Sequence, residues 1–199
     1  MKRALDEVVE LVAKVGIARP RDLAAHGIPR EYVQRLSRQG HLVKLGRGLY
    51  TLPDAPASTH RSFAEVSKAI PRAVICLLSA LRFHGLTTQL PSEVWIALDQ
   101  KARRPVATTF PVHITHLSGA SLREGIEEHL IDGVTVRIYS AAKTVADCFK
   151  FRNKIGTDIA VEALRDYLKT NRSGGDALWR YAKICRVSNV MKPYLESVG

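Results

Sequence analysis

The chain opens with apolar residues that recur at the spacing of a helix. Leu5, Val8, Val9 and Val12 occupy positions i, i+3, i+4 and i+7, which places them on one helix face. Gly16 follows them, and glycine is the usual residue just past the end of a helix. The pattern therefore predicts a first amphipathic helix that ends before Gly16.

Proline and glycine mark the limits of two further helices. Pro20 fits the first turn of a short second helix, Asp22 suits its positive N-terminal end, and Gly27 ends it. A third helix is expected between Pro29, at its first position, and Gly40, which stops it. Three short helices are thus expected before the pattern changes.

The pattern changes to that of strands over residues 41–52. Two short alternating runs flank Gly46-Arg47-Gly48, which predicts a β-hairpin. Three helices followed by a hairpin is the order of a winged helix-turn-helix, expected here over residues 1–55. Residues 53–59 are small, polar and twice interrupted by proline, as in a linker. A second domain is then expected over residues 60–199.

The second part of the chain mixes helical and strand patterns. Residues 126–131 and 134–139 flank Asp132-Gly133, the strongest short hairpin signal in the chain. The other expected strands are 93–98 and 112–117, and the expected helices are 61–70, 73–84, 140–149 with Ser140 as N-cap, 160–168 and 178–185. The predicted fold class is α+β: a winged helix-turn-helix followed by a mixed α/β domain with antiparallel strands and C-terminal helices.

The composition is that of a folded protein with a polyanionic partner. Hydrophobic residues make up 46% and charged residues 25% of the 199 residues, which argues against disorder. Thirty lysines and arginines exceed nineteen acidic residues and give a net charge of +11. This surplus favours nucleic acid, because basic side chains that meet phosphates release condensed counterions.

The cysteines and the N-terminus indicate a cytoplasmic protein. Cys76, Cys148 and Cys185 are widely spaced within apolar or helical patterns, as reduced core thiols are. Acidic residues interrupt the segment after Lys2 and Arg3, so no signal peptide is expected. The apolar runs are too short to span a bilayer, and no membrane segment is expected.

The third predicted helix has a polar face suited to the major groove of DNA. This face carries Arg30, Gln34, Arg35 and Arg38, and it lies opposite the apolar Val33 and Leu36. Glutamine can pair bidentately with adenine and arginine with guanine. The N-terminal end of such a reading helix usually enters the groove most deeply.

Basic residues concentrate where this motif lies. Residues 19–47 contain seven basic and two acidic residues, which gives this segment a net charge of +5. Arg47 lies between two glycines at the expected tip of the wing, where it can reach a phosphate or a minor groove. The predicted DNA-binding residues are Arg19, Arg21, Arg30, Gln34, Arg35, Arg38, Lys44 and Arg47. The alternative is a solvated face on a protein-contact module, since helix-turn-helix folds serve that role too.

No complete catalytic, cofactor or metal site is predicted. Asp99-Gln100-Lys101 at the end of an apolar strand resembles half of a metal-dependent nuclease site. Such a site needs a second acid from a neighbouring strand, and Glu93 lies on the same strand. His113 and His116 fall on opposite faces of a strand and cannot chelate one metal together. No nucleotide-binding fingerprint is present.

Residues 16–36 and Gly46-Arg-Gly-Leu-Tyr50 resemble the N-terminal winged helix of AbiEi-family antitoxins. The resemblance continues in residues 79–91 and 143–158, which are similar to segments of that family's second domain. It implies a bacterial type IV toxin–antitoxin partner. The first domain would repress its own promoter, and the second would counter a nucleotidyltransferase-like toxin, directly or indirectly. Because one short reading helix covers only a few base pairs, the operator is expected to be an inverted repeat bound by a dimer.

The resemblance also implies that the protein is not an enzyme and needs no cofactor. Carried over residue by residue, it assigns Arg30, Gln34, Arg35 and Arg38 to the reading helix and Arg47 to the wing. For the antitoxin function it implies only a basic surface, with Lys143, Lys150, Arg152 and Lys154 as candidates. The alternatives are a simple Asp147–Arg152 pair beside core residues Val145 and Phe149, and, for the whole protein, a winged helix fused to a metal-dependent nuclease-like domain.

Overall fold

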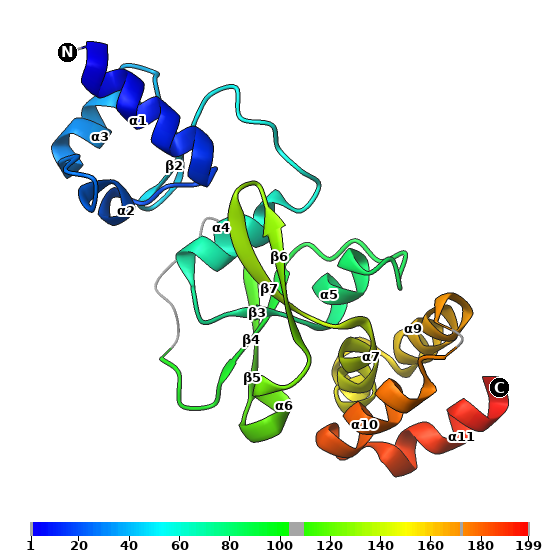
Figure 1. Ribbon diagram of the computed structural model, residues 1–199. Helices are drawn as coiled ribbons and strands as arrows, with labels where there is room; N and C mark the ends of the chain where they lie inside the picture. Colours follow the sequence, from blue (N-terminus) through cyan, green and yellow to red (C-terminus); the bar gives the residue numbers. More distant parts are fainter. Residues whose placement is uncertain (1, 104–109, 172, 199) are drawn as a thin grey trace. The chain divides into compact units, whose positions relative to one another are not determined.

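The computed structural model describes residues 2–103, 110–171 and 173–198 (Figure 1). Helices and strands both occur along the chain, so the predicted α+β class is confirmed. Among the described residues, no helix is long and apolar enough to cross a membrane.

The chain divides into two compact units. The first unit contains the described residues up to 72 together with 110–111 and 129–136. The second unit contains residues 73–103, 112–128 and those from 137 onwards. The helix that follows the linker and the tip of the 126–139 hairpin therefore belong to the first unit. The functional limits 1–55 and 60–199 stay a prediction.

The first unit has the element order expected of a winged helix-turn-helix. Its elements are α1 (Lys2–Val15), α2 (Pro20–Ala24), α3 (Arg30–Arg38), β1 (Val43–Gly46), β2 (Leu49–Thr51) and α4 (Arg61–Ala69). Ala18, between α1 and α2, exchanges two backbone hydrogen bonds with Tyr50 of β2 and so ties the helices to the hairpin. Val8, Val12, Leu23 and Val33 are fully buried in one apolar cluster.

A close contact between two turns completes this unit. Gly16, at φ +67°, lies so near the Asp132 carbonyl that a Cβ atom there would overlap it. Asp132 and Gly133 both have positive φ, as a two-residue hairpin turn requires. The Asp132 carboxylate also accepts a hydrogen bond from the Ser58 backbone N–H at 3.2 Å. Glycine is therefore required at position 16 by space as well as by backbone conformation.

A five-stranded mixed sheet runs through the second unit, with the order β5-β4-β3-β7-β6. Its strands are β3 (Val74–Ile75), β4 (Val94–Asp99), β5 (Val112–Leu117), β6 (Ile126–Ile131) and β7 (Val134–Tyr139). β3 pairs antiparallel with β4, whereas the β4–β5 and β3–β7 pairs are parallel. The helix predicted from Ala73 is shorter, because β3 precedes α5 (Leu77–Phe83).

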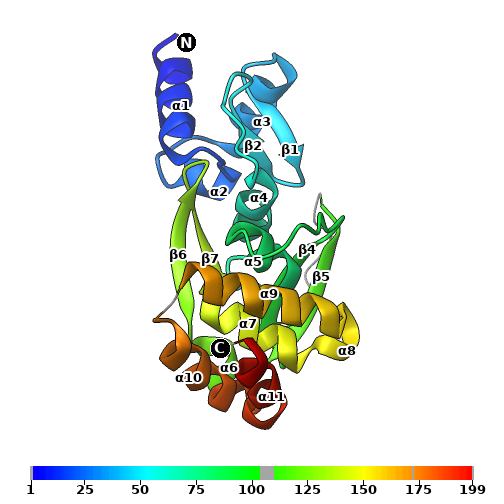
Figure 2. The same ribbon diagram turned by 90° about the vertical axis from the view of Figure 1, so that its right-hand side faces the viewer.

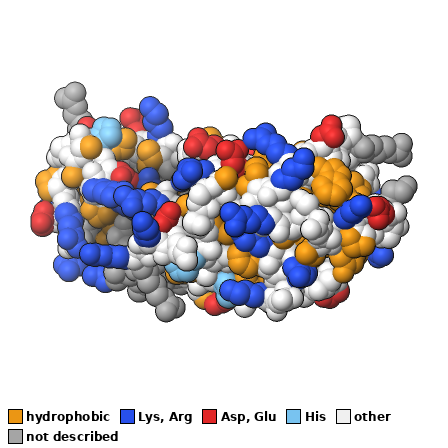
Figure 3. All heavy atoms as spheres, turned by 90° about the horizontal axis from the view of Figure 1, so that it is seen from below, with side chains coloured by type: hydrophobic (Ala, Val, Ile, Leu, Met, Phe, Trp, Pro, Cys, Tyr) orange, Lys and Arg blue, Asp and Glu red, His pale blue; other side chains and the backbone are white. Residues whose placement is uncertain are grey.

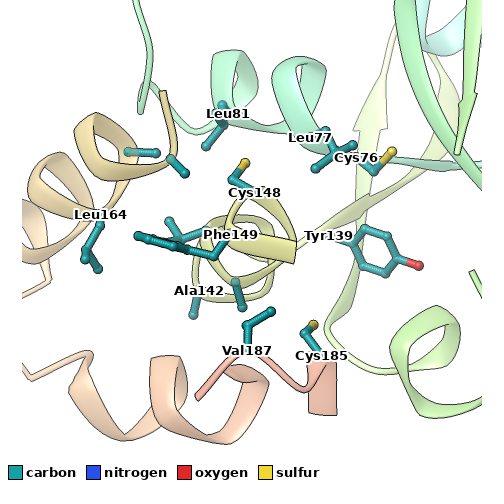
Figure 4. Packing of buried hydrophobic residues seen from close by; sticks show 14 of the residues in the cluster. Cys76, Leu77, Leu81, Tyr139, Ala142, Cys148, Phe149, Leu164, Cys185 and Val187 are labelled. Atoms are coloured by element: carbon teal, nitrogen blue, oxygen red, sulfur yellow. The ribbon is translucent and has the colours of Figure 1, made fainter. Parts of the chain in front are cut away.

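Helices account for the rest of the second unit. They are α6 (Gly119–Arg123), α7 (Ala141–Lys150), α8 (Arg152–Ile155), α9 (Thr157–Thr170), α10 (Gly175–Cys185) and α11 (Ser188–Val198). Ser140 caps α7 as predicted, its side chain accepting from the Lys143 N–H. α7 packs against α5, α9, α10 and α11 (Figure 2). Val145 and Phe149 are completely buried, as predicted, and side chains from several helices surround α7 (Figure 4).

Lys143 does not lie on the surface, where the resemblance to AbiEi antitoxins placed it. Its side chain is completely buried, and Nζ donates to the Asp147 carboxylate one helical turn later. The ammonium also lies 4.2 Å from the centre of the Tyr139 ring. That prediction is wrong, because residues four apart share a helix face and the carboxylate allows the lysine to be buried with it.

Candidate nucleic-acid interface

Four of the predicted DNA-binding arginines meet at one recess of the first unit. Arg19, Arg21, Arg30 and Arg47 line a hollow of about 700 Å³, which Ala69 of α4 also lines. In Figure 3, Lys and Arg side chains gather at the left-hand end, on the side where Figure 1 draws α2 and α3. Residues from the α1–α2 connection, the start of α3 and the wing are thus brought together.

Local backbone geometry sets two of these arginines at the rim. Arg30 is the first residue of α3, and Pro29 before it is extended with φ −65° and ψ 148°. Arg47 and Gly48 form the turn between β1 and β2, where Gly46 pairs with Leu49 and Gly48 has φ +70°. The start of α3 and the tip of the wing therefore present one guanidinium each to the same hollow.

Arg19 is a half-buried cation without a full set of partners. Within the described part of the chain, one of its terminal nitrogens is buried and has no hydrogen-bond partner. Burial and the charge of Arg21 lower the pKa of Arg19, against the opposite effect of Asp22. Arginine stays protonated through such a shift. A buried, incompletely paired guanidinium favours the arrival of an anionic oxygen.

Asp22 is a carboxylate beside these arginines, and it is already paired. Asp22 accepts from the Arg19 N–H at 3.1 Å, which caps α2. Lys68 Nζ of α4 lies 2.8 Å from Asp22 Oδ2, and Arg21 Nε lies 3.7 Å from Asp22 Oδ1. Burial raises the pKa of Asp22, but Lys68 and the Arg19 N–H outweigh it, and the net pKa is below its usual value. Asp22 is therefore ionised at neutral pH, and Lys68 compensates its charge. Lys68 was not among the residues predicted, because it lies beyond the hairpin.

The remaining predicted residues lie outside the recess. Gln34, Arg35 and Arg38 are exposed on the face of α3 opposite buried Val33 and Leu36, as predicted. Lys44 is exposed on β1.

Tyr32 is a neighbour that the sequence analysis did not assign. The Arg35 guanidinium lies 4.7 Å from the centre of the Tyr32 ring, a contact that restricts a long flexible side chain. The spacing i, i+3 between an aromatic residue and an arginine was the available signal.

In the second unit, the residues predicted for a basic antitoxin surface occupy three kinds of position. Lys143 is buried and paired, as described above. Lys150 and Arg152 line a second recess, whereas Lys154 is exposed on α8. Arg152 donates to the Phe149 carbonyl at 2.9 Å, and Asp147 pairs with Lys143 rather than with Arg152.

The residues weighed for catalysis have separate partners. Asp99 accepts from the Lys101 N–H at 2.8 Å at one end of β4, and Glu93 before the other end lies 3.5 Å from His113. His113 stacks on Trp95, and His116 Nδ1 lies 3.3 Å from the Asp99 carbonyl. The described residues contain no group of three or more His, Cys, Asp or Glu side chains arranged to hold a metal ion.

A comparison with known proteins matches the segment that contains these arginines. No curated protein matches the chain. Residues 6–53, which contain most of α1 and all of α2, α3 and the wing, match the family described as "Transcriptional regulator, AbiEi antitoxin". The resemblance predicted from the sequence is thereby confirmed for this N-terminal segment, which is similar to AbiEi antitoxin transcriptional regulators.

Proposed function

We propose that the protein is a cytoplasmic DNA-binding autorepressor and the antitoxin of a type IV, AbiE-like toxin–antitoxin system. The observation that carries the DNA-binding part is the convergence of Arg19, Arg21, Arg30 and Arg47 at one hollow beside the exposed face of α3. The family match of residues 6–53 supports the regulatory role.

The arrangement suits a duplex because it separates two kinds of contact. The arginines of the recess and the wing tip present cations that can meet phosphates, which position a protein on DNA. Gln34, Arg35 and Arg38 on α3 present the side-chain types that read base edges in the major groove. We therefore assign phosphate contacts to the recess and base contacts to the middle of α3.

Binding to its own promoter is expected to depend steeply on salt. Neutralising about five phosphates gives a slope of log K against log[salt] of roughly −4 to −5 for duplex DNA. Fluorescence anisotropy with a promoter duplex and a scrambled duplex of equal length, over a series of salt concentrations, measures the slope. A flat salt response, or equal affinity for both duplexes, would contradict the proposal.

The operator is expected to be an inverted repeat bound by two copies. One short reading helix covers few base pairs, so high affinity needs a second copy on the same face of the duplex. Half-site centres should then lie about 10 base pairs apart or a multiple of that distance. Footprinting of the promoter tests this, and a single asymmetric half-site bound with full affinity would argue against a dimer.

The predicted second domain, residues 60–199, is proposed to counter a nucleotidyltransferase-like toxin through a basic surface. Residues 60–199 carry 20 basic and 13 acidic residues, a balance of +7. This charge suits an acidic protein surface or a nucleic acid that the toxin uses. Lys150, Arg152 and Lys154 are the candidates on this surface, and buried Lys143 is not among them.

Repression and protection are expected to be separable in the full-length chain. Reversing the charge of Lys150, Arg152 and Lys154 to glutamate should abolish protection from the toxin and leave repression intact, because the DNA-contacting arginines are unchanged. Arg30→Ala with Arg47→Ala should abolish repression and leave protection from the toxin intact. Cell survival on toxin induction and a promoter reporter are the two measurements.

Loss of both activities in either variant, with folding intact, would contradict separate roles. Incubation of the purified protein with plasmid, RNA and Mg²⁺ or Mn²⁺ tests the nuclease alternative. Cleavage that Asp99→Ala abolishes would replace the antitoxin proposal with that alternative.

A further inference from the structure

The second unit contains a basic recess that the DNA-binding proposal does not use. It has a volume of about 700 Å³ and lies among α6, the start of α8 and the connection between α10 and α11. Its polar lining consists of Ser118, Ser121, Lys150, Arg152 and Arg186. The rest of the lining is glycine, alanine, cysteine and branched aliphatic residues, so no carboxylate is among the described residues that line it.

The three cations of this recess lack acidic partners. Lys150 Nζ lies 3.4 Å from the Ser121 hydroxyl, and Arg152 uses one nitrogen on the Phe149 carbonyl. Within the described part of the chain, neither of them nor Arg186 forms an ion pair with a carboxylate. Like charges that converge without a counter-charge repel one another, so their arrangement favours an anion between them.

The buried wall behind the recess does not cancel this charge. Cys185 lines the recess and donates through Sγ to Asp147 Oδ1 at 3.2 Å. Burial, then the charge of Asp147, raises the pKa of the Cys185 thiol to about 12, so it stays neutral at physiological pH. Asp147 in turn is paired with Lys143. The wall is therefore neutral overall, and Lys150, Arg152 and Arg186 set the potential of the recess.

Arg186 occupies a position at which an arginine is strained. It ends α10 in the left-handed conformation, with φ +60° and ψ +41°. The Val187 N–H reaches the Ala182 carbonyl at 2.8 Å, the hydrogen bond typical of a helix end at which glycine is usual. Residues other than glycine that are held in this left-handed conformation occur preferentially at binding and catalytic sites. Here the strained residue supplies the third cation of the recess.

We infer that this recess binds the phosphate group of a small phosphorylated ligand, such as a nucleotide. Guanidinium and ammonium groups together with serine hydroxyls are the donors that phosphate oxygens accept. The volume of the recess lies within the range of about 300 to 1,000 Å³ that is usual for small-molecule sites. Ile184, Val187 and Val190 offer an apolar wall to the organic part of such a ligand.

This inference is independent of DNA binding by the first unit. It shares Lys150 and Arg152 with the proposed antitoxin surface, but its test uses purified protein without toxin. Failure of one proposal is therefore distinguishable from failure of the other. Phosphate groups also occur along nucleic acids, so the experiment compares small phosphorylated molecules with a short single-stranded RNA.

Isothermal titration calorimetry of the full-length protein with inorganic pyrophosphate, ATP and the RNA tests the inference. Lys150→Gln with Arg152→Gln should weaken pyrophosphate and ATP binding about tenfold or more, since two charge-assisted contacts are lost. The matched control is Lys154→Gln, which removes a neighbouring exposed charge outside the recess. Arg30→Ala with Arg47→Ala weakens the basic recess of the first unit. In that background, Lys150→Gln with Arg152→Gln should lower pyrophosphate and ATP affinity by the same factor as in the otherwise unchanged protein.

The variant Arg186→Gly distinguishes a loss of ligand binding from a loss of folding stability. Glycine relieves the left-handed strain, so the melting temperature should stay the same or rise while pyrophosphate binding weakens. The inference is overturned if neither pyrophosphate nor ATP binds, if only the RNA binds, or if the recess variants bind as well as Lys154→Gln.

Discussion

Replacing Arg30 and Arg47 together with alanine is expected to weaken binding to every duplex by about 2 to 6 kcal/mol, since losing one charge-assisted hydrogen bond to a phosphate costs roughly 1 to 3 kcal/mol. This corresponds to a loss of affinity of roughly thirtyfold to twenty-thousandfold. The two side chains approach the same hollow from different elements, the start of α3 and the tip of the wing. Because both are exposed, folding should be unaffected.

The control for this prediction is Lys14→Ala. Lys14 is an exposed basic residue in the last turn of α1 and does not line the recess. Removing its charge reports the effect of net charge alone, which we expect to be small at physiological salt. Anisotropy titrations with the promoter duplex measure both variants. Equal binding by the two variants would show that the recess does not contact DNA.

Replacing Lys143 with methionine is expected to destabilise the protein by about 3 to 5 kcal/mol, the usual effect of removing one partner of a buried ion pair. Asp147 would keep its hydrogen bond from Cys185, but it would lose the cation that compensates its charge. The Asp147 side chain is 1% exposed, so water cannot replace the lost ammonium group. The loss expected for Lys143→Met is a large fraction of the free energy of unfolding of a typical domain.

Two further variants identify the cause. Lys143→Met with Asp147→Leu removes both charges and should recover much of the loss, since an apolar pair of similar size can replace a buried ion pair. Lys150→Met, at the partly exposed end of the same helix, should change stability by about 0.5 kcal/mol or less. Urea unfolding measures all three. If the single and double variants are equally unstable, the unpaired carboxylate is not the cause.

Local signals were sufficient for most of the elements. The limits of α2 and α3 follow from proline and glycine, and the hairpin over residues 126–139 follows from Asp132-Gly133. Each of these signals acts through the conformation of a few adjacent residues, so no distant contact is needed to read it. The region around Ala73 was less clear, because a continuous apolar run fits a buried strand or a buried helix equally well.

The sequence by itself determined that three helices and a basic hairpin follow one another within residues 1–55, and that Gln34, Arg35 and Arg38 share a polar face, because these features depend on spacing along one element. Only the tertiary structure decided that Arg19, Arg21, Arg30 and Arg47 meet at one recess, that two strand pairs are parallel, and that Lys143 is buried while Lys150 is not. These features depend on which elements pack together, and the free energy of burying a charged residue depends on the partner that the packing brings to it.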